Sequence, residues 1–384
     1  MFNILLITDK HHYLYYKLFE NILRQDFDSK ISFTILLRDD NPVTQFDHLS
    51  KTLKNVSLIK YGQKFFSHDK GNSIRYGIKY NYDLISFMID LRKELTFKIK
   101  KLSPNLIITP SSDDISIRII RKYLEYIPVY YIQHSNIQKF HKKYGIRKKF
   151  WNYFHEKLSG IWMYSKMERP PFYDNGIIYL LWSKHSYKDN FYLSHDIRLI
   201  PKFSEIKLEN KLEVNKKRKV NKILVILNKR ANIGKIAWEE FAFFYKEALR
   251  KIKCQISVKI HPSEEVKDVE NYFDRKNIID DDFNINNYDL ILSHWSTFIY
   301  DAAINNIPFI LINPFFKYDY VDFHLDTYPI FLSKPKELID ILDRMENGLI
   351  DFNKINDEFL EKYFPMGIVN NSSQIIYDIV RENK

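Results

Sequence analysis

Residues 290–314 read LILSHWSTFIYDAAINNIPFILINP and contain a complete strand–helix–strand unit. The opening apolar run predicts a short buried strand, and residues 295–305 behind it have helical spacing. Pro308 then opens a second apolar run, PFILI, which predicts the next strand. Apolar runs without alternation are typical of strands that are buried on both faces. This unit therefore predicts a parallel sheet with helices on both sides.

The same alternation extends outward from this unit in both directions. In the second half we expect further strands at 222–227 and 255–260, and helices at 236–252, 266–273, 335–346 and 371–381. In the first half we expect strands at 2–8, 31–37, 56–61, 105–109, 129–133, 160–164, 177–181 and 197–200. The helices expected there cover 13–24, 74–102, 115–126 and 148–158. Strands separated by helices in this order indicate parallel βαβ units.

The 384 residues suggest two domains, and the sequence changes character between them. Residues 205–221, EIKLENKLEVNKKRKVN, contain few large apolar side chains and end in a basic run. We read this stretch as a linker or an exposed loop. The predicted fold class is α/β, with two Rossmann-like, doubly wound domains facing a cleft. The domains are residues 1–205 and 222–384, joined by a linker at 206–221, and the last helix is free to return to the first domain.

The composition excludes several classes of protein. Hydrophobic residues make up 45% of the chain and charged residues 28%, which is typical of a folded protein with a large core. The single cysteine excludes an internal disulfide and any cysteine-based metal cluster. We find no signal-peptide pattern and no spanning segment, so we expect a cytoplasmic protein. The net charge of +11 is either compositional drift or a preference for an anionic partner. We expect no nucleic-acid partner, because no nucleic-acid-binding motif is present.

Ligands of open parallel sheets bind beyond the carboxyl ends of the strands, and the second half offers three such places. VKIHP at 258–262 ends a strand at His261 and Pro262; the imidazole can bond a ligand phosphate or simply cap a turn. Ser293, Ser296 and Thr297 stand where a strand meets a helix. Free amides and hydroxyls there suit a phosphate, although an ordinary helix cap is the alternative.

The third place follows the first strand of the second half. Lys229 and Arg230 stand there and could offset the charge of a phosphate or carboxylate. A solvated basic loop is the alternative reading.

VKIHP and the stretch SHWSTFIYDAAINNIPFILINP at 293–314 together resemble the bacterial GT-B glycosyltransferases and related polymer transferases. Sialyltransferases, capsule Kdo transferases and CDP-glycerol glycerophosphotransferases carry an HP motif after a strand and a Ser-Ser or Ser-Thr motif at a helix start. The resemblance covers roughly 222–315 and implies a GT-B fold with a CMP- or CDP-activated donor. It also implies that His261, Ser296 and Thr297 hold the donor phosphate.

The first half would then bind the acceptor and supply the base. Asp113 and Asp114 follow one predicted strand, and His134 follows the next. Carboxylates and imidazoles can each deprotonate an acceptor hydroxyl. The alternatives are a helix cap for the two carboxylates and an ordinary strand-end histidine for His134. IQHSN at 132–136 also resembles the strand–His–Gly turn of the glycerophosphotransferases, with Ser135 in place of the glycine.

The resemblance implies an inverting transferase that moves a sialic-acid-like sugar or Kdo from a CMP-sugar to a surface glycan or glycolipid. We expect no cofactor and no required metal ion. The alternatives are a CDP-glycerol or CDP-ribitol phosphotransferase, a UDP-sugar transferase and a non-catalytic sugar or nucleotide binder. Aromatic and basic residues alternate between 123 and 154, which favours either peripheral contact with the inner face of a membrane or a charged surface loop.

Overall fold

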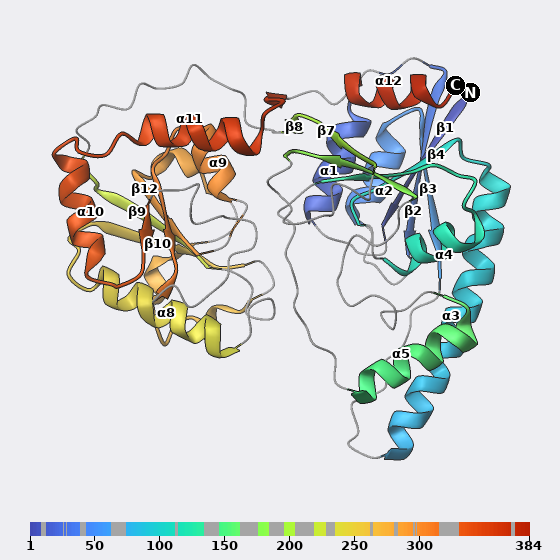
Figure 1. The fold of residues 1–384 in the computed structure, drawn as a ribbon, viewed down its shortest axis with the longest axis horizontal. Coiled ribbons are helices and arrows are strands. Elements are labelled where there is room, and N and C mark those ends of the chain that lie inside the picture. Colours follow the sequence, from blue (N-terminus) through green and yellow to red (C-terminus); the bar gives the residue numbers. More distant parts are fainter. Residues whose placement is uncertain are drawn as a thin grey trace. The chain divides into compact units, whose positions relative to one another are not determined.

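The computed structural model describes residues 1–8, 13–25, 27, 29–38, 44–62, 74–111, 114–133, 146–161, 176–183, 196–203, 219–227, 235–261, 264–279, 283–294, 296, 298–314, 330–369 and 373–384. The chain forms two compact units (Figure 1). Unit 1 contains residues 1–205 and 368–384, and unit 2 contains residues 206–367.

Unit 1 is built on a parallel sheet whose described strands follow the order β3-β2-β1-β4-β5-β6-β7. Its strands are β1 (Phe2–Thr8), β2 (Ile31–Arg38), β3 (Val56–Tyr61), β4 (Leu106–Thr109), β5 (Val129–Ile132), β6 (Ile177–Leu181) and β7 (Asp196–Leu199). Its helices are α1 (Tyr13–Leu23), α2 (Thr44–Thr52), α3 (Ile74–Leu102), α4 (Ile115–Tyr123) and α5 (Ile146–Ser159). The strand order reverses direction between β1 and β4, which makes the sheet doubly wound.

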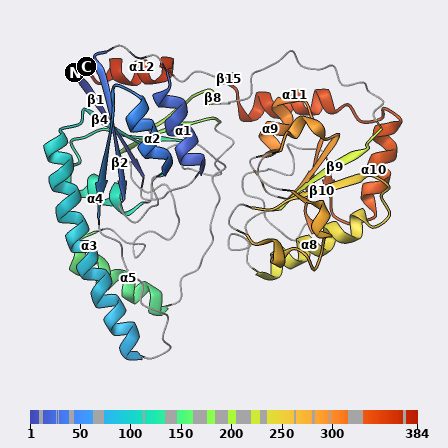
Figure 2. The ribbon, with the colours of Figure 1, turned by 180° about the vertical axis from the view of Figure 1, so that it is seen from behind.

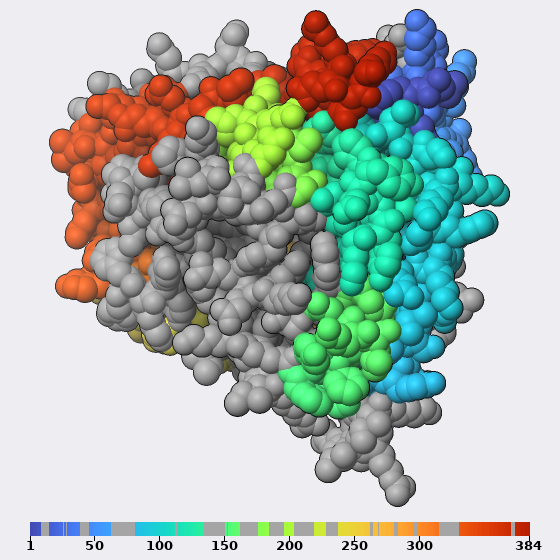
Figure 3. All heavy atoms as spheres, turned by 45° about the vertical axis from the view of Figure 1, so that its right-hand side comes forward, coloured from blue at the N-terminus to red at the C-terminus, as the bar shows by residue number. Residues whose placement is uncertain are grey.

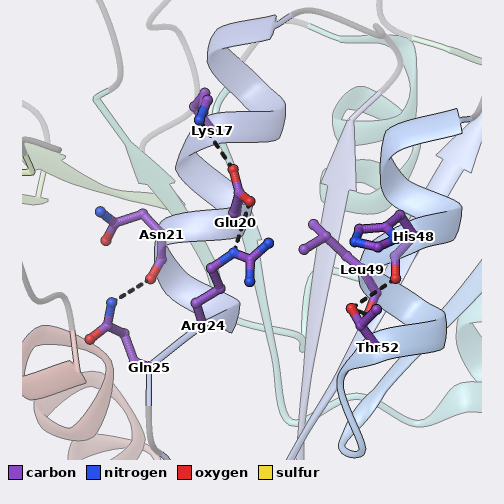
Figure 4. Close-up of polar contacts among 8 residues, drawn as sticks. All are labelled: Lys17, Glu20, Asn21, Arg24, Gln25, His48, Leu49 and Thr52. Carbon is purple, nitrogen blue, oxygen red and sulfur yellow. Dashed lines mark hydrogen bonds and ion pairs between the residues drawn. The ribbon is translucent and has the colours of Figure 1, made fainter.

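Two sets of helices cover opposite faces of this sheet (Figures 1 and 2). α1 and α2 lie on one face. Their outer sides carry local polar contacts: Glu20 accepts from Arg24 at 2.8 Å and lies 3.4 Å from Lys17 (Figure 4). Burial alone would raise the pKa of Glu20, but these two cations lower it. α3 and α4 lie on the other face and enclose an apolar core cluster, which includes Leu5, Met88 and Ile120.

Unit 2 repeats the same architecture. Its described strands follow the order β11-β10-β9-β12-β13-β14, all parallel. They are β9 (Lys222–Ile226), β10 (Gln255–Lys259), β11 (Ile278–Ile279), β12 (Leu290–Ser293), β13 (Phe309–Ile312) and β14 (Phe331–Leu332). The helices are α8 (Lys235–Leu249), α9 (Phe298–Ile304), α10 (Glu337–Glu346) and α11 (Phe352–Tyr363). α8 covers one face of this sheet, and α9 and α11 cover the other (Figure 1).

After unit 2 the chain returns to unit 1. β15 (Ile368–Val369) pairs in parallel with β8 (Lys202–Phe203), and α12 (Ser373–Glu382) follows. Asn383 donates to the Tyr130 hydroxyl at 2.7 Å, and the Tyr377 ring packs against Phe27. Both chain ends therefore lie on the same unit, close together (Figures 1 and 2).

The structure confirms the predicted fold class and corrects several elements. The sequence predicts a strand at 160–164, but Gly160 and Ile161 only terminate α5, and residues 162–164 lie outside the described part. The helix expected at 266–273 is a single 3-10 turn at Val266–Asp268. α2 and α11 are additional to the expected helices. The 206–221 linker also falls largely outside the described residues.

Candidate functional site

In the sheet of unit 2 the strand order reverses between β9 and β12. Three of the sequence motifs follow β9, β10 and β12, whose ends lie side by side at this reversal point. Ile226 of β9 pairs with Lys259 of β10 on one side and with Ser293 of β12 on the other. Since neighbouring strands lie about 4.8 Å apart, these three strand ends occupy roughly 10 Å of the edge. The segments that follow them leave the sheet at the point where doubly wound folds bind ligands.

Three of the seven predicted donor-site residues lie within the described part of unit 2. His261 stands two residues beyond β10, is half-buried, and its carbonyl accepts from the Glu264 amide at 2.8 Å. Ser293 is fully buried at the end of β12. The Ser296 hydroxyl accepts from the Phe298 amide at 3.3 Å, so Ser296 caps the start of α9, as the alternative interpretation predicts. The predicted residues Lys229, Arg230, Pro262 and Thr297 lie outside the described residues.

α9 is shorter than the helix that the sequence predicts after β12. It spans only the seven residues Phe298–Ile304, against the expected 295–305. A helix of two turns aligns few peptide dipoles, so its field contributes less at this edge than expected.

His294 lies inside the SHWST motif, but the sequence analysis does not select it as a site residue. Its ring is 1% exposed and stacks on Phe241 with centroids 4.1 Å apart. Its Nδ1 lies 3.1 Å from the Tyr245 hydroxyl. Burial lowers the pKa of His294 to about 3 and raises that of Tyr245 well above 10, so both groups are neutral at physiological pH.

The hydrogen bond to Tyr245 decides the tautomer of His294. The Tyr245 hydroxyl keeps its proton, and His294 is its hydrogen-bond partner among the described residues. We assign the hydroxyl as the donor to Nδ1, which places the imidazole proton on Nε2. Neither Nε2 nor the Ser293 hydroxyl has a partner within the described ranges, although both are buried. Buried polar atoms in this state cost about 1–3 kcal/mol each. This edge is therefore suited to receive a polar group.

Lys259 is the second residue that lies inside a quoted motif, VKIHP, without being selected as a site residue. It ends β10, is only 5% exposed, and lies two residues before His261. Its Nζ lies 5.3 Å from the ring centroid of Phe283 and 5.7 Å from that of Phe298. Cation–π contacts with these two rings hold the side chain of Lys259 in place. The amino group of Lys259 is therefore positioned at the end of the sheet.

At the corresponding edge of unit 1, neighbouring strands end just before the segments that contain the predicted residues. Thr109 of β4 pairs with Tyr131 of β5, so the segments after these strands are neighbours. The Thr109 hydroxyl donates to the Ser111 carbonyl at 2.8 Å and fixes the turn after β4. Gln133, after β5, accepts from the Trp182 amide at 2.8 Å and thereby ties β5 to β6.

Asp114 is the one predicted catalytic residue that the structure describes. It precedes α4, is 4% exposed, and its side chain makes no capping hydrogen bond to the helix. The helix-cap reading is therefore wrong for the side chain of Asp114. Asp113 and His134 lie outside the described residues. Arg118, one turn further along α4, is buried as well.

In the described residues no group of three or more His, Cys, Asp or Glu side chains is placed to hold a metal ion. In the same part of the chain, no helix is long and apolar enough to cross a membrane.

Comparison with known proteins places the fold. No family model and no curated protein sequence matches the chain. Solved structures do match over nearly the whole length. The calicheamicin glycosyltransferase CalG4 has a TM-score of 0.52 at 10% identity and covers 99% of this chain and 98% of its own. Acinetobacter baumannii MurG has a TM-score of 0.51 at 10% identity, with 99% of each chain covered.

An enzyme of a different reaction class shares this fold. UDP-GlcNAc 2-epimerase from Neisseria meningitidis, solved with UDP-GlcNAc, has a TM-score of 0.54 at 13% identity and covers 99% of this chain and 100% of its own. The chain therefore has a GT-B-like fold of two Rossmann-like units. At these identities the likeness establishes the fold and not the reaction.

Proposed function

We propose that this protein is an inverting glycosyltransferase that moves an acidic sugar from a CMP-sugar to a surface glycan or glycolipid. One observation carries the proposal. The reversal point of the sheet in unit 2 combines a buried cation, Lys259, with the buried polar atoms of Ser293 and His294, which have no partner in the described residues. His261 stands two residues beyond β10 at the same edge. The resemblance of VKIHP and SHWST to transferases with activated-cytidine donors supports cytidine.

In this proposal the groups of unit 2 bind the donor phosphate. Lys259 supplies a fixed positive charge, and His261 and the Nε2–H of His294 supply hydrogen-bond donors. Donors held rigidly in a buried site stabilise a developing phosphate charge more strongly than they would in water. Ser296 is given a supporting role, because its hydroxyl already accepts from the α9 backbone.

The chemical step follows from these roles. A carboxylate or imidazole of unit 1, drawn from Asp113, Asp114 and His134, takes the proton from an acceptor hydroxyl. That oxygen attacks the anomeric carbon as the bond between this carbon and the phosphate oxygen breaks. CMP leaves with the bonding electron pair, and the sugar inverts. The proposal requires no metal ion.

The nucleotide is the first property to measure, since the solved structures with this fold include enzymes bound to UDP and UDP-GlcNAc. We would record thermal unfolding with CMP, CDP, UMP, UDP, GDP and ADP. Ligand at 100 times its Kd adds about 2.7 kcal/mol of stability, or roughly 8 °C for a unit of this size. We expect CMP or CDP to give this shift. Stabilisation by uridine nucleotides alone would replace the CMP-sugar donor by a UDP-sugar.

Variants then test the location of the donor site. His261→Ala and Lys259→Met should each reduce the shift with CMP, because each removes a group that would face the phosphate. The exposed residues His48 and Lys276 provide matched controls, and His48→Ala and Lys276→Met should keep the full shift. If all four variants respond like the wild type, the nucleotide binds elsewhere.

The released products separate the remaining candidates. A glycosidic product with free CMP indicates sugar transfer, whereas CMP with a new phosphodiester indicates the runner-up, a CDP-glycerol or CDP-ribitol phosphotransferase. Asp114→Asn should lower kcat by about 10²–10⁴ if Asp114 is the base, with the nucleotide shift unchanged. Nucleotide binding without turnover for any donor would favour the non-catalytic binder.

A further inference from the structure

α5 has two different faces, and only one of them is used within unit 1. The inner face packs on α3, where His155 Nε2 lies 2.8 Å from the Asn81 side-chain oxygen. The opposite side carries four large apolar side chains that are between 42% and 55% exposed. They are Phe150, Tyr153, Phe154 and Leu158. Their spacing of three, four and eight residues places them along one stripe of the helix.

The stripe is a fixed feature of the surface, because its rings pack on one another and the helix is anchored at its end. The Phe150 and Phe154 rings lie 5.4 Å apart and form a continuous apolar patch. The last turn of α5 is tied to its neighbours: Arg92 of α3 donates to the Ser159 carbonyl at 2.6 Å, and Tyr123 of α4 donates to the Gly160 carbonyl at 3.0 Å. The aromatic rings are therefore held outward by the fold.

Cations accompany this stripe. The Lys157 ammonium lies 5.7 Å from the Tyr153 ring centroid. The α5 sequence contains Arg147, Lys148, Lys149 and Lys157 against one carboxylate, Glu156. In Figure 3 the light-green atoms of α5 lie at the surface beside the blue atoms of α3. Aromatic rings with flanking lysines are the composition of helices that lie in the interface of an anionic bilayer.

We propose that the outer face of α5 binds the surface of an anionic lipid bilayer, with the four apolar side chains entering the headgroup region and Lys157 facing the lipid phosphates. A second copy of the chain suits this face less well. A symmetric dimer would bring the net positive charge of α5 from both copies together, and like charges would oppose the contact. This inference does not depend on the reaction proposed above.

Sedimentation with lipid vesicles tests the proposal on the full chain. We expect binding to vesicles that contain roughly one third phosphatidylglycerol, much weaker binding to pure phosphatidylcholine, and a decrease with added salt. Phe150→Ser combined with Phe154→Ser should weaken binding about tenfold or more, because two half-buried rings no longer enter the interface. Lys157→Glu should weaken it by a similar factor.

The control is Phe243→Ser on α8 of unit 2, where the side chain is 59% exposed. This variant loses a similar ring elsewhere and should bind like the wild type. Circular dichroism establishes that each variant is folded. The proposal is wrong if the wild type does not bind vesicles that contain phosphatidylglycerol, or if the double variant binds them as well as Phe243→Ser does. A wild-type dimer that the double variant abolishes, without vesicle binding, would overturn it and identify the face as a contact between copies.

Discussion

His294 illustrates how one residue can be both buried and available. It is stacked on Phe241 and bonded to Tyr245, so its ring orientation is fixed, yet its Nε2 has no partner in the described part of the chain. Fixing the ring in this way removes the entropy cost of orienting a hydrogen-bond donor when a ligand arrives. The same burial disfavours the protonated form of His294, and this lowers the stability of the folded state in acid.

We predict that His294 makes unit 2 less stable in mild acid. Its pKa is about 3 in the folded state, against the ordinary value of 6.5 that applies to the unfolded chain. Between these values only the unfolded state binds the proton, so stability falls as the pH drops from about 6.5 toward 3. At pH 5 the contribution is about 2 kcal/mol. Urea unfolding of the wild type and of His294→Gln at pH 7.5 and pH 5 measures it.

The comparison between the two pH values isolates the titration from the loss of packing. His294→Gln lowers stability at both pH values, because it removes the stacked ring, but it should lose less between pH 7.5 and pH 5 than the wild type does. His155 also has a pKa lowered by burial, and it remains in both proteins. Equal losses in the two proteins would show that His294 does not titrate as described.

The sequence identifies the right strand ends but not all of the side chains that lie there. His261, Ser293 and Ser296 can be found because they stand in short motifs beside apolar runs. Lys259 and His294 stand in the same motifs, but their roles cannot be predicted, because their environment comes from residues distant in the sequence: Phe283 and Phe241 lie more than 20 and 50 residues away. A lysine inside a buried strand is the one local signal.

At the scale of elements, the junction after α5 shows how a helix end is positioned. Gly160 has a φ of +74°, and its carbonyl accepts from Lys122 at 2.5 Å and from Tyr123 at 3.0 Å. Cationic side chains at the C-terminal carbonyls of a helix are favourable for its dipole. The sequence predicts a strand here because GIWMY is apolar, and periodicity alone does not reveal a glycine in the left-handed region.

We predict that Gly160→Ala destabilises unit 1 by about 2 kcal/mol. Part of the cost is the positive φ, about 1 kcal/mol for an L-residue. The rest arises because the added Cβ would collide with the Arg92 guanidinium and the Tyr123 hydroxyl. Chemical denaturation measures the change.

Gly367→Ala provides the matched control. Gly367 has a φ of +76°, but a Cβ there meets nothing within 4 Å. It should therefore show only the backbone cost. If both alanine variants lose the same free energy, the collision with Arg92 and Tyr123 contributes nothing.

Most of the sheet strands are predictable from apolar runs, and the elements that the sequence misses share a physical reason. α11 carries its buried residues Phe352, Asn356, Phe359 and Tyr363 on one face, and two of these four are polar or part-polar. β14 and β15 have two residues each, which is too short for any pattern. Pairing with neighbours, not local propensity, makes them strands.

At the scale of the whole molecule, the last seventeen residues belong to unit 1 although they follow unit 2. α12 buries Ile376, Ile379 and Val380, and Glu382 pairs with Arg198. The N-terminal 205 residues therefore lack part of their own packing surface when the C-terminal segment is absent.

We predict that ending the chain after Gly367 destabilises unit 1 and leaves unit 2 unchanged. Three buried aliphatic side chains are lost, which removes about 5 kcal/mol. Amide hydrogen exchange should become faster in β1 and β4–β6, with protection of β9, β10 and β12 retained. Ending the chain after Asn383, which removes only the exposed Lys384, is the control and should cost little. Equal loss of protection in both units would mean that they unfold together.

The return of the chain to unit 1 also sets an order of events during synthesis on the ribosome. Residues 206–367 emerge after most of unit 1 but before its last helix. At about 5–20 residues per second, the ribosome needs roughly 10–30 s to translate them. During that time the nascent unit 1 exposes the apolar surface that α12 later covers. All residues of unit 2, in contrast, have been synthesised before α12 is made. Unit 2 can thus finish folding ahead of the unit that begins the chain, and a stalled or truncated product leaves unit 1 open to chaperones and proteases.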